Sequence, residues 1–126
     1  MVPYTASIGA RVEQLEPGHV VVSMRDRRRV RNHLRSVHAI ALANVGELST
    51  GLALLGAMGP EVRGILTGIE VRYVKKARGR LRAEARCAIP RVTERTEYSV
   101  EARITDDSGE VVATVEALWL LSPVPA

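Results

Sequence analysis

The chain has 126 residues, of which 46% are hydrophobic, so it can bury a core of its own as a single domain over residues 1–126. Its net charge of +4 comes from sixteen arginines and two lysines against fourteen acidic residues, and suits either solubility or a phosphate-bearing metabolite. Aromatic residues make up only 3%, which argues against the stacking platforms of nucleic-acid binding, and the single cysteine, Cys87, excludes an internal disulfide and suits the reducing cytoplasm.

The first half of the chain predicts two strands and one long helix. The strands are expected over residues 8–16 and 19–25, with a turn at Pro17 and Gly18 between them. Residues 36–60 are mostly apolar and hold one charged side chain, Glu47. This composition predicts a helix enclosed by protein on nearly every side, and its glycines and polar residues argue against a membrane span.

The second half of the chain has the period of two that is typical of strands. Each strand has one apolar face, so an antiparallel sheet with a single dry side is expected. In the first strand, the odd positions from Ile65 to Tyr73 are predicted to share one face. The sequence therefore predicts an α+β fold in which a curved antiparallel sheet wraps around one long helix. The four strands are expected over residues 65–74, 81–89, 97–104 and 111–121.

This layout resembles the hotdog fold, and its motifs resemble those of acyl-CoA thioesterases of the phenylacetyl-CoA type. Asn32, His38 and Glu47 stand at the spacings of that family's Asn, His and acidic residue. The segments 71–85 and 108–119 resemble its third strand with the following turn and its closing hairpin. The resemblance implies a hydrolase that cleaves a thioester of coenzyme A, which enters as part of the substrate and not as a separate cofactor.

Glu47 is the candidate catalytic group, as general base for water or as direct nucleophile. A thiol with a pKa near 8.5 leaves with little acid assistance, so one carboxylate can suffice. At 100° per residue, Asn44, Glu47 and Thr50 are expected along one helix stripe that would bind substrate. The alternative is a buried carboxylate with a purely structural bond to Asn44 or to a partner chain.

The resemblance also implies a site shared by two chains. The backbone N–H of Ala39 would hold the developing oxyanion, and Asn32 would bond the carboxylate or water from the partner side. His38 and Glu47 fall on opposite helix faces, so a site that uses both needs a homodimer, alone or as a dimer of dimers. His38 alternatively serves only as a capping or interface residue.

Further substrate contacts are expected on the strand and turn that follow the helix. Thr67 is a candidate on the strand, and Lys75, Lys76 and Arg78 form a basic cluster at its end. The cluster is either a solvated turn or a landing surface for the phosphates of coenzyme A, with the arginines of residues 25–35 as a second candidate surface.

Two other functions remain open at this point. Ala39-Ile40 replaces the Gly-Gly of the resembled motif, which favours a non-catalytic acyl-CoA-binding or sensing module. A dehydratase of hydroxyacyl thioesters, with His38 paired to a carboxylate, is the third reading. No metal-ligand spacing is found, so no metal is expected, and there is no glycine-rich phosphate loop. The few aromatic residues and the polar residues of the helix make a nucleic-acid or membrane partner unexpected as well.

Overall fold

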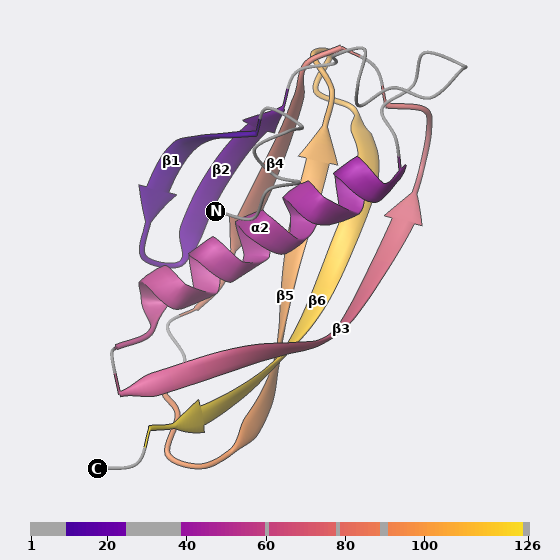
Figure 1. Ribbon diagram of the computed structural model, residues 1–126. Coiled ribbons are helices and arrows are strands. Elements are labelled where there is room, and N and C mark those ends of the chain that lie inside the picture. Colours follow the sequence, from indigo (N-terminus) through magenta and orange to yellow (C-terminus); the bar gives the residue numbers. More distant parts are fainter. Residues whose placement is uncertain (1–9, 25–38, 60, 78, 89–90, 125–126) are drawn as a thin grey trace.

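The computed structural model describes residues 10–24, 39–59, 61–77, 79–88 and 91–124. These residues form one helix and six strands, and the strands make a single antiparallel sheet in the order β1-β2-β4-β5-β6-β3 (Figure 1). The elements are β1 (Arg11–Glu16), β2 (His19–Met24), α2 (Ala39–Ala57), β3 (Val62–Tyr73), β4 (Leu81–Arg86), β5 (Thr96–Thr105) and β6 (Val111–Pro123).

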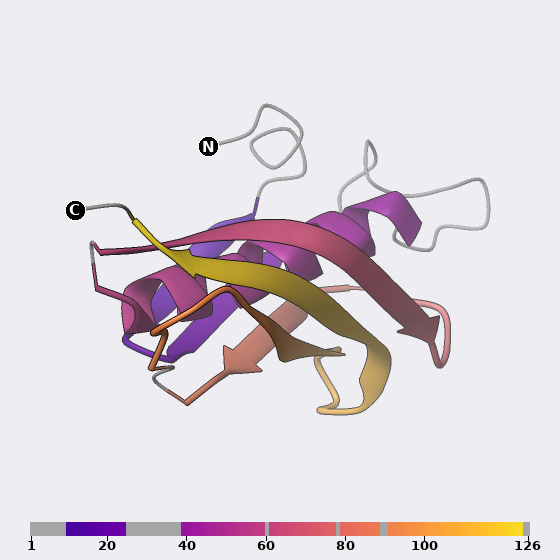
Figure 2. The same cartoon turned by 90° about the horizontal axis from the view of Figure 1, so that it is seen from below.

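The sheet curls around α2, with β3 on one side of the helix and β2 and β4 on the other (Figure 2). The chain has no phenylalanine, and most of the buried side chains between helix and sheet are alanine, valine and leucine. Gly46 has no side chain at all, which lets α2 approach Val115 of β6 closely. The predicted sheet wrapped around one helix is therefore present, and the turn between β1 and β2 includes Gly18 at a φ of 77°.

The expected enclosure of the helix on nearly every side is wrong for the single chain. The inward face of α2, with Ala53 and Leu54, is fully buried, whereas Glu47 and Leu55 are exposed. One layer of sheet can cover only one side of a helix, and among the described residues no second layer covers the other side.

The predicted shared face of residues 65–73 in β3 is also wrong. The pairing of β3 with β6 shifts register between Leu66 and Gly68, which makes Thr67 the extra residue of a β-bulge. Before the bulge Ile65 lies opposite Leu120, and after it Ile69 lies opposite the buried Ala117. Because one inserted residue reverses the alternation, Ile65 and Ile69 lie on opposite faces of the sheet.

Strand β3 forms one edge of the sheet, because it pairs with β6 alone. Twelve residues long, it carries three large apolar side chains with at least 43% exposure, Ile65, Ile69 and Tyr73. A long apolar edge strand is a template for pairing with another chain. Within the described residues, no helix is both long and apolar enough to cross a bilayer.

Candidate functional site

Glu47 lies on the outward side of α2. Asn44, Glu47, Gly51 and Leu55 follow one another at helical spacing and form a stripe, which we call the outward stripe. Glu47 and Leu55 are exposed, Asn44 is half-buried and Gly51 is buried. The expected burial of the carboxylate is thus not found among the residues that the structure describes.

Thr50 does not belong to this stripe, although the spacing predicted it there. Its side chain is fully buried, and its hydroxyl donates a hydrogen bond to the backbone carbonyl of Glu47, 3.0 Å away. At 100° per residue Thr50 and Asn44 lie about 60° to either side of Glu47, and the side of Thr50 is the one turned toward the core. Its hydroxyl is therefore occupied inside the protein.

Trp119 of β6 packs against the outward stripe one helical turn beyond Glu47. A β-carbon at Gly51 would lie 3.2 Å from Cζ2 of the indole, and one at Gly64 of β3 would lie 3.6 Å from its Cε3. The indole therefore fills the space between the helix and β3. Its buried Nε1–H has no hydrogen-bond partner within the part of the chain that the structure describes.

The helix-facing side of β3 continues this surface beyond Trp119. Ile69 and Tyr73 lie opposite the buried residues Ala117 and Ala113 of β6, so they lie on the same side of the sheet as α2, yet they are 43% and 53% exposed. Thr67 is exposed at the bulge, where its hydroxyl donates to the carbonyl of Leu118 at 3.2 Å. The helix side of β3 thus carries exposed apolar surface, and the carboxylate of Glu47 on α2 is exposed as well, among the residues that the structure describes.

Three of the predicted site residues lie outside the described residues: Asn32, His38 and Arg78. Ala39 is the first residue of α2. Backbone N–H groups in the first helical turn have no intrahelical acceptor, which is the feature that the predicted oxyanion role of Ala39 requires. The catalytic roles of Asn32, His38 and Ala39 and the substrate-binding role of Arg78 stay predictions.

The basic cluster separates into two kinds of lysine. Lys75 forms ion pairs with Asp106 at 2.9 Å and Glu110 at 2.7 Å, and these two carboxylates raise its pKa. Hydrogen bonds from Ser108 and the ammonium of Lys75 hold the pKa of Asp106 well below its usual range. Lys76 is exposed. Of these two lysines, Lys76 is the one whose charge is left for a phosphate.

A hollow on the other side of the sheet was not anticipated from the sequence. It measures about 480 Å³ and is lined by residues that include Glu13, Ser23, Arg80 and Arg82. The Ser23 hydroxyl donates to Glu13 at 2.5 Å and lowers the pKa of that carboxyl. Because Ser23 and Arg82 are register partners on the face away from α2, this hollow is remote from Glu47.

Cys87 and His19 make contacts within the chain and are not part of the candidate site. Cys87 packs against the core, as predicted, and burial raises the pKa of its thiol. His19 bonds Glu84 through Nε2 at 2.6 Å, and this bond lowers the pKa of Glu84. Among the described residues, no group of three His, Cys, Asp or Glu side chains could hold a metal ion.

Comparison with known proteins places the fold among the thioesterases. A crystal structure from Pseudomonas aeruginosa, of a protein of unknown function described as a probable thioesterase, is 32% identical. It has a TM-score of 0.89 and covers 97% of this chain and 88% of its own. A thioesterase family protein from Silicibacter pomeroyi is 24% identical, with a TM-score of 0.81 and coverages of 97% and 90%.

A third similar structure is a variant of a thioesterase enzyme from Staphylococcus aureus. It is 18% identical, with a TM-score of 0.82, and covers 97% of this chain and 100% of its own. The search of curated proteins found no match. The model of the DUF4442 family, a domain of unknown function, matches residues 1–121. The chain therefore belongs to the DUF4442 family and has the hotdog fold of thioesterase-family proteins.

Proposed function

We propose that this protein hydrolyses acyl-CoA thioesters, with Glu47 acting on the thioester at a site completed by a second copy of the chain. The observation that carries the proposal is the position of Glu47, an exposed carboxylate on the outward side of the central helix. The thioesterase-type relatives support the same class of reaction. The cytoplasm is the compartment we propose, where acyl-CoA esters occur and a single cysteine stays reduced.

The chemistry requires only one carboxylate. As general base, Glu47 would accept a proton from water while the water oxygen attacks the thioester carbonyl carbon. As nucleophile, its own oxygen would attack and form an anhydride that water then opens. In both routes the C–S bond breaks from a tetrahedral oxyanion and the thiolate leaves. The N–H of Ala39 from the other chain would stabilise that oxyanion, assisted by His38 and Asn32.

The second copy would be brought in by β3. Two β3 edges paired antiparallel about a two-fold axis would extend the sheet across both chains and satisfy their free backbone groups. The same contact would cover Ile69 and Tyr73, the exposed apolar residues on the helix side. Glu47 would then lie at the boundary between the subunits. Asn44, on the same stripe, would contact the acyl group, and Lys76, after the end of β3, would contact a phosphate.

A substitution at Glu47 tests the mechanism. Glu47→Gln keeps the size of the side chain and removes its basicity, so we expect a loss of about 10²- to 10⁴-fold in kcat over a panel of aryl, short-chain and long-chain acyl-CoA esters. Glu61→Gln, at another exposed glutamate, is the matched control and should keep the wild-type rate. Equal rates for Glu47→Gln and wild type would remove Glu47 from the chemistry.

A non-catalytic acyl-CoA-binding module is the second candidate, and the β-carbon of Ala39 favours it. Alanine stands at this position where the resembled motif has glycine, and a side chain there would restrict the approach of a carbonyl to the helix start. Tight acyl-CoA binding by calorimetry without release of free thiol from any ester would select this function.

A further inference from the structure

The hollow of about 480 Å³ on the side of the sheet away from α2 lies over a row of three residues. Strand pairing places Ser23 of β2, Arg82 of β4 and Thr105 of β5 side by side. Residues next to them in the chain, Ala83 and Ile104, are buried in the core. Because side chains alternate along a strand, the row itself faces away from the helix.

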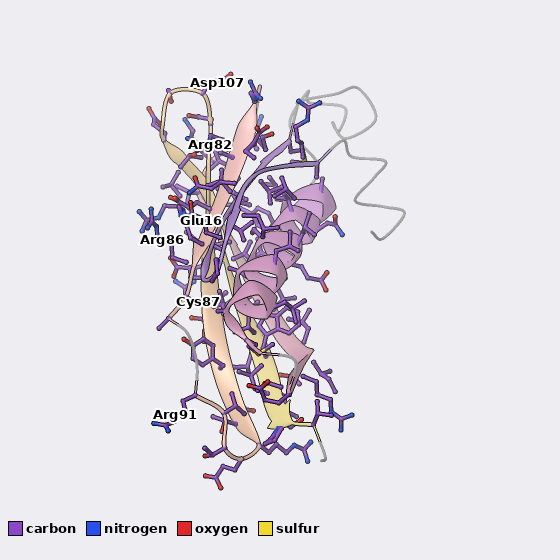
Figure 3. All side chains as sticks on the ribbon, turned by 90° about the vertical axis from the view of Figure 1, so that its left-hand side faces the viewer. Glu16, Arg82, Arg86, Cys87, Arg91 and Asp107 are labelled. Atoms are coloured by element: carbon purple, nitrogen blue, oxygen red, sulfur yellow. The ribbon has the colours of Figure 1, made fainter. Side chains whose placement is uncertain are left out.

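Carboxylates stand at two sides of this hollow. Glu13 is the extra residue of a β-bulge, because the pairing of β1 with β2 skips it. The Ser23 hydroxyl donates to Glu13, and this bond, with the charges of nearby arginines, lowers the pKa of the carboxyl and keeps it ionised. Asp107, in the turn between β5 and β6, accepts the backbone N–H of Arg80 at 3.3 Å. Figure 3 shows Asp107 and Arg82 near the same end of the sheet.

Two arginines complete the lining, and their donors are in surplus. Arg80 is exposed and reaches Glu13 only at 3.6 Å. Arg82 forms no salt bridge with any other residue that the structure describes. Asp106 also lines the hollow, but its charge is already balanced by Lys75 at 2.9 Å. Since each guanidinium has five N–H donors in a fork that matches a carboxylate, this side of the hollow suits an anionic group.

We propose that the hollow binds a free amino acid through its carboxylate and its ammonium group. The carboxylate lies between the guanidinium groups of Arg80 and Arg82, with the Thr105 hydroxyl as a further donor. The ammonium group lies against Glu13 and Asp107, because a carboxylate that accepts one hydrogen bond has lone pairs left for others. About 480 Å³ is within the range of small-molecule pockets, so the side chain of the amino acid has room as well.

The charge balance of the lining selects a zwitterion over a ligand with one sign of charge. Once Lys75 is paired with Asp106, two arginines face two carboxylates. A phosphate dianion would be repelled by the carboxylates, and a simple amine by the arginines. Among the described residues, no His, Cys, Asp or Glu group is suited to a metal ion. Because the hollow faces away from α2, this site is independent of the proposed function.

Calorimetry on the wild-type chain with each of the twenty standard amino acids tests the site. We expect at least one of them to bind, and its analogues without the amino group or without the carboxylate to bind at least roughly tenfold more weakly. Arg82→Gln should weaken binding of the amino acid by a similar factor, because it removes the guanidinium fork. Asp107→Asn should weaken binding of the amino acid and leave binding of the deaminated analogue unchanged.

The matched control is Arg103→Gln, the same change at an exposed arginine of β5 that does not line the hollow. This variant should keep the wild-type affinity, and circular dichroism checks that every variant is folded. The proposal is overturned if the wild type binds none of the twenty amino acids, or if Arg82→Gln binds as tightly as Arg103→Gln. Equal affinity for the amino acid and its deaminated analogue would overturn it too, since a plain carboxylate would then be the ligand.

Discussion

Gly46 of α2 lies directly against Val115 of β6, and a β-carbon at residue 46 would overlap the valine side chain. This contact fixes the height of the central helix above the sheet. It follows that the distance from the outward stripe to β3 depends on one missing methyl group, although Gly46 itself is buried and cannot touch a ligand.

Gly46→Ala should therefore destabilise the protein by about 1–3 kcal/mol, because the inserted methyl must displace the helix or Val115. Gly56→Ala on the same helix is the matched control, since its β-carbon would meet nothing closer than 3.7 Å. In that position alanine should add about 0.5–1 kcal/mol through its helix propensity. Urea unfolding of both variants gives the two values, and equal effects would refute the overlap.

The turn between β5 and β6 should make stability depend on pH. The carboxylate of Asp106 accepts hydrogen bonds from the Ser108 N–H at 3.0 Å, the Ser108 hydroxyl at 2.6 Å and the Glu110 N–H at 3.1 Å. Its pKa is lower in the folded chain than in the unfolded one. The stabilisation is thus fully present above the unfolded pKa of about 3.9 and is lost as the pH falls from there toward the folded pKa.

We therefore expect Asp106→Asn to be less stable than wild type at neutral pH, with the difference shrinking below about pH 4. Asp107→Asn, one residue along, should change the pH profile much less, because Asp107 accepts only one bond at 3.3 Å, from the Arg80 N–H, among the bonds described. Urea midpoints from neutral to acid pH measure this, and parallel profiles for Asp106→Asn and wild type would contradict it.

The two neighbouring lysines should respond differently to removal. Lys75→Ala breaks the ion pairs to Asp106 and Glu110, so it should lower the thermal midpoint and leave KM unchanged. Lys76→Ala should leave the midpoint unchanged and raise KM for acyl-CoA esters by roughly 3- to 10-fold, if its charge contacts a phosphate. Steady-state kinetics with thermal scans separate the two, and a KM effect confined to Lys75→Ala would reverse the assignment.

Self-association through β3 should depend on the apolar residues beside its free edge. Ile69→Glu places a charge on the surface that a second copy would cover, and we expect association to weaken by at least roughly tenfold. Leu15→Glu on β1, at the opposite edge of the sheet, is the control and is also exposed. Sedimentation over a range of concentrations measures both, and an undiminished association of Ile69→Glu would exclude this edge.

Much of the fold could be predicted from the sequence, because alternation and turn residues are local signals. The four strands after the helix, the turn at Gly18 and the helix around Glu47 are all present. The bulge at Thr67 could not be read in this way. Both Leu66 and Ile69 suit a core, and only the pairing with β6 decides which positions share a face.

The site was less predictable, since its geometry depends on rotation about the helix and on contacts between strands. Helical spacing predicted that Asn44, Glu47 and Thr50 share one stripe. The first two do, whereas Thr50 lies in the core. Lys75 forms an ion pair with Asp106, which is thirty-one positions away in the sequence, so no local pattern could reveal this pair. Strand pairing also places Glu70, Glu116 and Glu101 side by side on three strands, which no local pattern could reveal either.

Thr67, the inserted residue in β3, decides which face of the sheet receives the apolar side chains that follow it and which receives the charged ones. Deleting Thr67 would move Ile69 and Tyr73 to the face away from the helix and turn Glu70 and Arg72 toward it. The helix side of this edge strand would lose its exposed apolar residues, and the opposite face of the sheet would lose two charged side chains. A single supernumerary amino acid thus keeps the apolar and the charged side chains that follow it on opposite faces of the same strand.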